Sequence, residues 1–151
     1  MKNVIRRGVW NSNSSSVHAL TIDKSGMRPS NLPTDSEGYI VGHFGYFGTE
    51  ECVYSNQEDK LSYLLTQLYY LNHYSDDFSD FYPFLCIEEA ICEYTGAKGI
   101  KIEGNFNDKC GIDHQSIPEY FELNMGIDYC SNESIQNFIF NSYISFSTGS
   151  D

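Results

Sequence analysis

The clearest pattern along the chain is a stripe of leucines spaced three or four residues apart between residues 57 and 74. This spacing places the apolar side chains on one face of a helix, so it predicts an amphipathic helix over residues 57–74. The polar stretch Ser55–Glu58 resembles a capping box and marks the start of that helix. The stripe consists of Leu61, Leu64, Leu65, Leu68 and Leu71.

Two shorter segments have the same helical spacing. Residues 83–94 begin with a proline, which suits the first turn of a helix, and Gly96 beyond them suits its C-terminal cap. Residues 133–140 follow Ser131 and Asn132, either of which can cap a helix. The apolar positions of the first segment are Phe84, Ile87, Ile91 and Tyr94.

Runs of β-branched and aromatic residues predict short strands around these helices. The run over residues 39–47 is interrupted by Gly42 and Gly45, and glycines inside a strand often mark a bulge or a close backbone approach. Residues 25–37 contain glycine and proline and predict a loop. The other predicted strands are residues 4–10, 17–22, 99–103 and 143–147, with a short strand or turn at 110–114.

Strands and helices do not alternate regularly along the chain, which argues against a doubly wound parallel sheet. The pattern therefore predicts a single compact α+β domain over residues 1–151. We expect a small, mostly antiparallel sheet with two to three helices.

The composition indicates a globular protein with an aromatic core. Hydrophobic residues make up 40% of the chain and include 12 Tyr and 10 Phe, which excludes a disordered acidic tail. Nine basic residues oppose 21 acidic residues, for a net charge of -12. Binding to a nucleic-acid backbone requires clustered cations and is therefore not expected. A partner that is itself basic is favoured.

The negative charge is concentrated because no Lys or Arg occurs between Lys60 and Lys98, or after Lys109. In the first of these stretches carboxylates are mixed with aromatic residues, a composition typical of protein interfaces. The alternative is a solvated face that keeps the protein soluble, with the aromatic residues in the core. The predicted partner-binding residues are Asp76, Asp77, Asp80, Glu88 and Glu89. Further acidic residues are Glu93 in this stretch and Glu119, Glu122, Asp128 and Glu133 beyond it.

Neither a signal peptide nor an apolar run long enough to span a membrane is evident in the sequence. The five cysteines are an odd number at irregular spacing, which argues against a secreted disulfide framework. A reducing cytoplasm is the expected location.

Four groups of motifs, in order along the chain, resemble a family of small phage and prophage proteins. The first is Arg7–His18 (RGVWNSNSSSVH), where the family has R-x-G-V-F-E-T-N-S-S-S-x-H. Three departures stand out: Asn11 and Ser12 replace Glu and Thr, His43 replaces Glu, and Ser150 replaces Asn. The remaining motifs are Gly42–Tyr46 and Lys60–Leu64, then Glu93–Ala97 with Ile112–Ser116, then Phe138–Asn141 with Thr148–Asp151.

The family includes inhibitors of type II-A CRISPR nucleases, and the chain looks like a zinc-containing member of this class. The resemblance implies stoichiometric binding to a type II-A Cas effector nuclease in the cytoplasm of the bacterial host. It also implies that target-DNA loading is blocked through the recognition lobe of the nuclease. It implies no enzymatic activity, no direct contact with nucleic acid and no membrane association.

A structural Zn²⁺ site is a further hypothesis, because three histidines and a cysteine lie in or beside these motifs. Zinc in proteins is held by His, Cys or carboxylate ligands, and an extended segment would place Cys110 and His114 on one face. No sequence-local zinc motif is present, so the alternative is that the histidines are ordinary polar residues packed against strands. The predicted ligands are His18, His43, Cys110 and His114, with Cys52 or Asp113 as substitutes.

The serine run and the Asp113–His114 pair contain the residue types of a nucleophilic site, so a small phage enzyme is an alternative function. Serine and asparagine commonly form turns by bonding their own backbone, and this interpretation is favoured. A third possibility is a phage protein unrelated to host defence.

Overall fold

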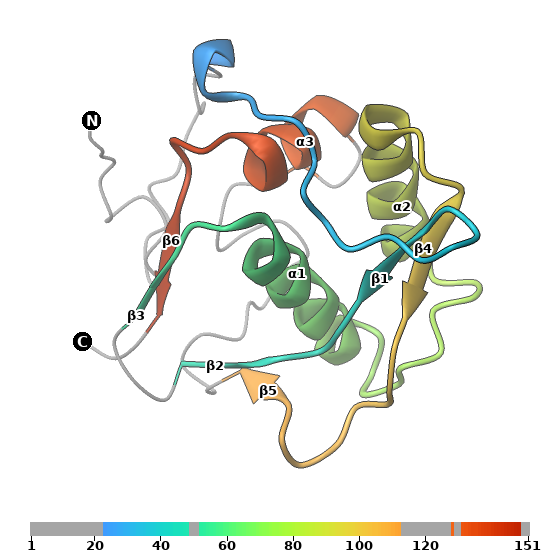
Figure 1. Cartoon of the computed structure of the whole chain (residues 1–151). Coiled ribbons are helices and arrows are strands. Elements are labelled where there is room, and N and C mark those ends of the chain that lie inside the picture. The colour runs from blue at the N-terminus through green and yellow to red at the C-terminus, as the bar shows by residue number, and fades with distance from the viewer. Residues whose placement is uncertain (1–22, 49–51, 113–127, 129–130, 149–151) are drawn as a thin grey trace.

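The structure, a computed structural model, describes residues 23–48, 52–112, 128 and 131–148. Within these ranges the chain forms a single 3₁₀ turn at Lys24–Gly26, and three α-helices and six short strands around one aromatic and aliphatic core (Figure 1). The helices are α1 (Gln57–Leu71), α2 (Tyr82–Thr95) and α3 (Asn132–Phe140). The strands are β1 (Tyr39–Gly42), β2 (Tyr46–Phe47), β3 (Cys52–Tyr54), β4 (Gly99–Ile102), β5 (Gly111–Ile112) and β6 (Phe146–Thr148).

Helix α1 confirms the helix predicted from the leucine stripe, although it ends earlier than expected. Asn56 caps its N-terminus, because the side-chain oxygen of Asn56 accepts a hydrogen bond from the Asp59 backbone N–H at 2.8 Å. The helix ends at Leu71 because His73 and Tyr74 both adopt positive φ angles, 57° and 63°. The Tyr74 N–H then bonds the Tyr69 carbonyl, which turns the chain away from the helix axis.

Helices α2 and α3 are also confirmed, together with the caps that the sequence predicts. Pro83 lies in the first turn of α2, and Gly96 follows the helix with a φ of 81°, which glycine adopts without steric cost. The Ser131 hydroxyl caps α3 by accepting a hydrogen bond from the Ser134 N–H at 3.1 Å. No helix in the described ranges is long and apolar enough to cross a bilayer.

The expected α+β class is confirmed, but the expected antiparallel pairing is wrong for most of the strands. Strands β1 and β4 pair in parallel, as do β2 and β5, and only β3 and β6 are antiparallel. Antiparallel neighbours are usually joined by short hairpins. Here both α1 and α2 lie between β1 and β4 in the chain. This long connection returns the chain to the same end of the strand pair, so β4 runs in the direction of β1.

The break that Gly42 and Gly45 predict in the 39–47 run is present, between β1 and β2. Partners in the β1–β4 pair are 60 residues apart in sequence, and partners in the β2–β5 pair are 65 apart. The loop between β4 and β5 is therefore five residues longer than the link between β1 and β2. A side chain at position 42 would overlap Leu65, whose Cδ1 is only 2.6 Å from a Cβ placed there. Gly42 thus lets α1 pack closely against β1.

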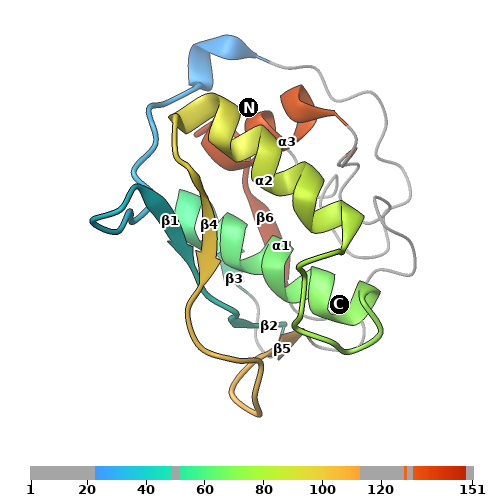
Figure 2. The same ribbon diagram turned by 90° about the vertical axis from the view of Figure 1, so that its right-hand side faces the viewer.

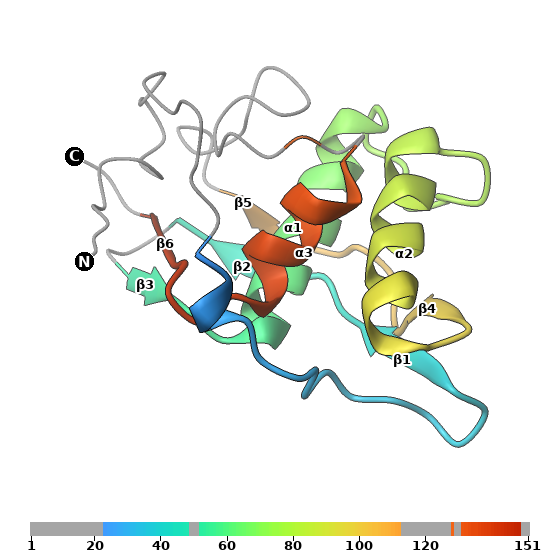
Figure 3. The same ribbon diagram turned by 90° about the horizontal axis from the view of Figure 1, so that it is seen from above.

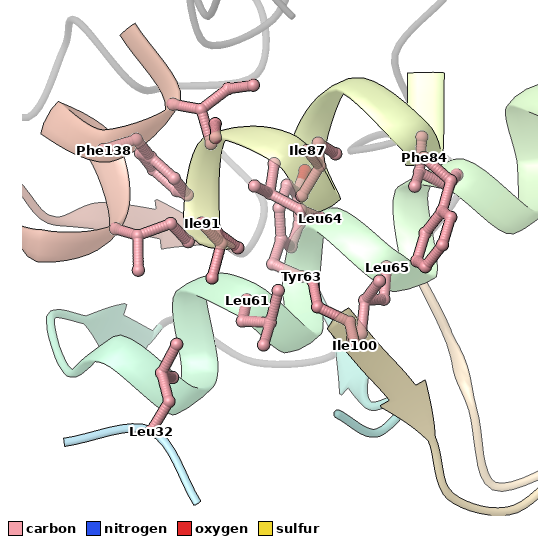
Figure 4. Close-up of a cluster of buried hydrophobic side chains, with 14 of the residues drawn as sticks. Leu32, Leu61, Tyr63, Leu64, Leu65, Phe84, Ile87, Ile91, Ile100 and Phe138 are labelled. Carbon is pink, nitrogen blue, oxygen red and sulfur yellow. The ribbon is translucent and has the colours of Figure 1, made fainter. Parts of the chain in front are cut away.

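Helix α1 lies at the centre of the fold and contributes the fully buried Leu64, Leu65 and Leu68. The three two-stranded sheets lie around α1, while α2 and α3 lie beside it (Figures 1 and 3). In the close-up of the core, residues of α1, α2, α3 and β4 converge on one another (Figure 4). At the β3–β6 side the core is aromatic, because Phe146 packs against Tyr63 and Tyr54 with ring centroids 4.5 and 5.0 Å apart.

The remaining predicted strands have mixed outcomes. Strands 4–10 and 17–22 lie outside the described residues, as does the end of the predicted 110–114 segment. The strand expected at 143–147 begins later, at Phe146. Its antiparallel partner β3 was not predicted, because Cys52–Tyr54 has only three residues and no regular alternation.

Candidate functional site

The predicted partner-binding carboxylates lie on α2 and on the connection from α1 to α2, and two of them bond backbone N–H groups of neighbouring segments. The Asp76 carboxylate accepts a hydrogen bond from the Phe106 N–H at 3.0 Å, which fixes the β4–β5 loop. The Glu88 carboxylate, which is half-buried, accepts one from the Ile100 N–H at 2.9 Å. These two residues therefore attach α2 and the connection before it to the segment that contains β4 and β5.

The other three carboxylates of the predicted set are exposed, as is Asp76. Asp77 accepts hydrogen bonds from the backbone N–H and hydroxyl of Ser79, and these bonds hold the pKa of Asp77 below its usual range. Asp80 and Glu89 form no hydrogen bond or ion pair with any residue that the structure describes. Since α2 and its approach contain no Lys or Arg, the charge of these three groups is not compensated locally.

The aromatic residues near this acidic stretch divide into a packed group and an exposed group. Phe78 is buried, while Tyr69 is half-buried and stacks on Phe106 with 3.5 Å between ring centroids. In contrast, Tyr74 and Tyr82 are 68% and 64% exposed. Burial in the core is therefore shown for Phe78 and in part for Tyr69, while Tyr74 and Tyr82 lie at the surface and their role in an interface stays a prediction.

His43 lies in the link between β1 and β2 and faces an acidic residue. Its Nε2 atom is 2.9 Å from a carboxylate oxygen of Glu103, and both side chains are largely exposed. The Ser62 hydroxyl donates to the His43 carbonyl at 2.9 Å, which holds this link against α1. A pocket of about 160 Å³ lies beside His43, and its lining includes the carboxylates Glu58 and Asp59.

Cys110 comes directly before β5, and His43 comes shortly before β2. Because β2 and β5 run in parallel, both residues lie at the same end of this strand pair. Their side chains have different partners, however, because the Cys110 thiol lies 3.8 Å from the Asn107 side-chain oxygen. Cys52 is exposed on β3, and the four cysteines in the described ranges are all free.

The described residues do not by themselves form a zinc site. No three His, Cys, Asp or Glu side chains within them converge as metal ligands would. The predicted ligands His18 and His114, and the substitute Asp113, lie outside the described residues. Zinc binding therefore stays a prediction in which His43 and Cys110 would contribute two of the ligands. The serine run and Asp113–His114 of the alternative enzyme also lie outside the described residues.

The buried side chain of Lys60 was not anticipated from the sequence. It is fully buried, and its ammonium group donates a hydrogen bond to the Asn141 carbonyl at 3.0 Å and lies 5.8 Å from the centre of the Phe138 ring. Burial lowers the pKa of Lys60 to about 7. Lys60 lies four residues before Leu64 and therefore on the apolar face of α1. This spacing is the sequence feature from which the burial of Lys60 could have been predicted.

Comparisons of the chain with family models, with curated proteins and with solved structures give no match. The candidate site consists of exposed carboxylates and exposed aromatic side chains on α2 and on the connection that precedes it.

Proposed function

We propose that this protein inhibits a type II-A Cas nuclease by binding to it stoichiometrically and blocking the loading of target DNA, in the cytoplasm of the bacterial host. The observation that carries the proposal is the uncompensated negative charge of Asp77, Asp80 and Glu89 on a stretch of chain, residues 74–89, that also has the exposed rings of Tyr74 and Tyr82. The identity of the partner rests on the resemblance of the sequence motifs to phage inhibitors of this nuclease class.

The physical argument is electrostatic. Such nucleases hold the guide–target duplex in a positively charged channel. A protein with a net charge of -12 is attracted to the same surfaces that attract DNA. Carboxylates bound at or beside that channel would compete with DNA phosphates, and the attraction would accelerate association. This mechanism needs contact between proteins, and it needs neither catalysis nor direct binding to nucleic acid.

The test is a titration of the protein into a nuclease–guide complex, followed by measurement of the target duplex that binds. We expect DNA binding to be lost, with saturation near one equivalent of the protein. Addition of the protein after the duplex has been loaded is the control for occlusion, and should displace less DNA. Inhibition at far below one equivalent would favour the enzyme alternative, and unchanged DNA binding would overturn the proposal.

A further inference from the structure

Helix α2 has one face in the core and an opposite face open to solvent. Its buried face contains Ile87 and Ile91, both fully buried. On the outward face, Tyr82 and Leu85 remain 64% and 42% exposed, although both are large and apolar. Figure 2 looks onto α2, and no other helix or strand that the structure describes lies in front of it. This face is therefore accessible to a partner.

Helical geometry places acidic and apolar groups together on this face. Tyr82 and Glu89 are seven residues apart and so point in directions only about 20° apart around the helix, with Leu85 within about 60° of Tyr82. Asp80 is exposed just before the first turn of α2. We call the set Asp80, Tyr82, Leu85 and Glu89 the α2 face.

We propose that the α2 face is the centre of the surface that docks onto the nuclease, with Tyr82 and Leu85 as apolar anchors and Asp80 and Glu89 as charged groups that steer association. This inference rests on the proposed function and adds the location of the contact. Aromatic anchors surrounded by polar groups are typical of the energetically dominant part of an interface. A stable contact covers about 800 Å² on each partner, so the α2 face is its centre and not its whole extent.

The charge of the α2 face determines the kind of partner that it fits. With carboxylates and no cation on the helix, it complements a positively charged protein surface that has an apolar depression for Tyr82. Nucleic acid would be repelled by Asp80 and Glu89. A second copy of this chain would place these carboxylates against the same groups of its partner, at a cost in free energy.

Two double variants separate the two roles. Removal of the apolar anchors, Y82A with L85A, should increase the dissociation rate of the nuclease complex by tenfold or more, because anchors of this kind account for much of the binding free energy. Removal of the charges, D80N with E89Q, should lower the association rate and weaken its salt dependence, with a smaller effect on dissociation.

The matched controls carry the same kinds of change elsewhere on the surface. V53S removes an apolar side chain that is 64% exposed on β3. E58Q with D108N neutralises two exposed carboxylates outside the α2 face. Glu58 is a matched position for Asp80, because Glu58 lies in the first turn of α1 and Asp80 lies just before α2. Circular dichroism and urea unfolding of every variant should match the native protein, so that a loss of binding reflects the surface and not the fold.

The outcomes distinguish this inference from the proposed function. If the native protein binds the nuclease and the α2-face variants bind as tightly and as fast, the contact lies elsewhere and only this inference is overturned. If the native protein does not bind the nuclease at all, the proposed function fails, and the partner assigned to the α2 face fails with it. If sedimentation shows a dimer that Y82A with L85A dissociates, the α2 face joins two copies of the chain and the docking proposal is wrong.

Discussion

Replacement of Lys60 by methionine should make the protein more stable at neutral pH, and should remove part of the dependence of its stability on pH. Methionine keeps the length of the lysine side chain and brings no charge into the core. In the native protein the Lys60 amine is fully buried and has one hydrogen-bond acceptor, the Asn141 carbonyl. No carboxylate in the described ranges forms an ion pair with it.

The size of the effect follows from the pKa of Lys60, which burial lowers from 10.5 to about 7. Between these two pH values the unfolded chain binds a proton on Lys60 that the folded chain does not bind, so stability falls as the pH falls through this range. At about 1.4 kcal/mol per pH unit, the whole range corresponds to nearly 5 kcal/mol. Below pH 7 both states hold the proton, and the difference stays constant.

The variant loses the hydrogen bond to Asn141, at a cost of about 1–3 kcal/mol because the carbonyl is buried. At pH 7 the buried amine is half protonated and the penalty is about 4 kcal/mol, so the expected net gain for K60M is about 1–3 kcal/mol. The pH dependence is the more specific test, because the stability advantage of the variant should shrink by about 2–3 kcal/mol between pH 7.5 and pH 9.5. Burial raises the pKa of Tyr63, so measurements should stop before tyrosines in the unfolded chain ionise.

Urea unfolding followed by circular dichroism at several pH values measures this difference. The variant K109M is the control, because Lys109 is exposed and its replacement removes no buried charge. The difference between K109M and the native protein should be the same at every pH. Parallel pH curves for K60M and the native protein would refute the argument, since they would mean that the Lys60 amine keeps its proton on folding without a penalty.

Two further predictions concern the metal and the attachment of α2. Protein purified without added metal should contain about one equivalent of zinc by elemental analysis, and C110S should lower that zinc content. A zinc content below a few tenths of an equivalent in the native protein would eliminate the zinc hypothesis. The variant E88A should destabilise the protein by about 1–3 kcal/mol, because the Ile100 N–H loses its acceptor. The variant E88Q retains an acceptor oxygen and should recover most of that loss, whereas equal stabilities for E88A and the native protein would show that the bond contributes nothing.

The sequence by itself determined the three helices and most of their ends, although the end of α1 at Leu71 was not predicted. The leucine stripe of α1, Pro83 and Gly96 of α2, and Ser131 of α3 are local signals, since a helix forms its hydrogen bonds within a few residues of chain. The interruption of the 39–47 run at its glycines was equally local. The abundance and position of the acidic residues were also evident from the sequence alone.

Only the tertiary structure decided how the strands pair and which carboxylates bond the backbone of another segment. The parallel direction of β4 depends on how two helices return the chain, and no residue within the strand encodes it. Asp76 and Glu88 look like Asp80 and Glu89 in the sequence, yet the first two bond backbone N–H groups of Phe106 and Ile100. A backbone N–H in the folded protein needs an acceptor, and only the folded chain shows which carboxylate provides it.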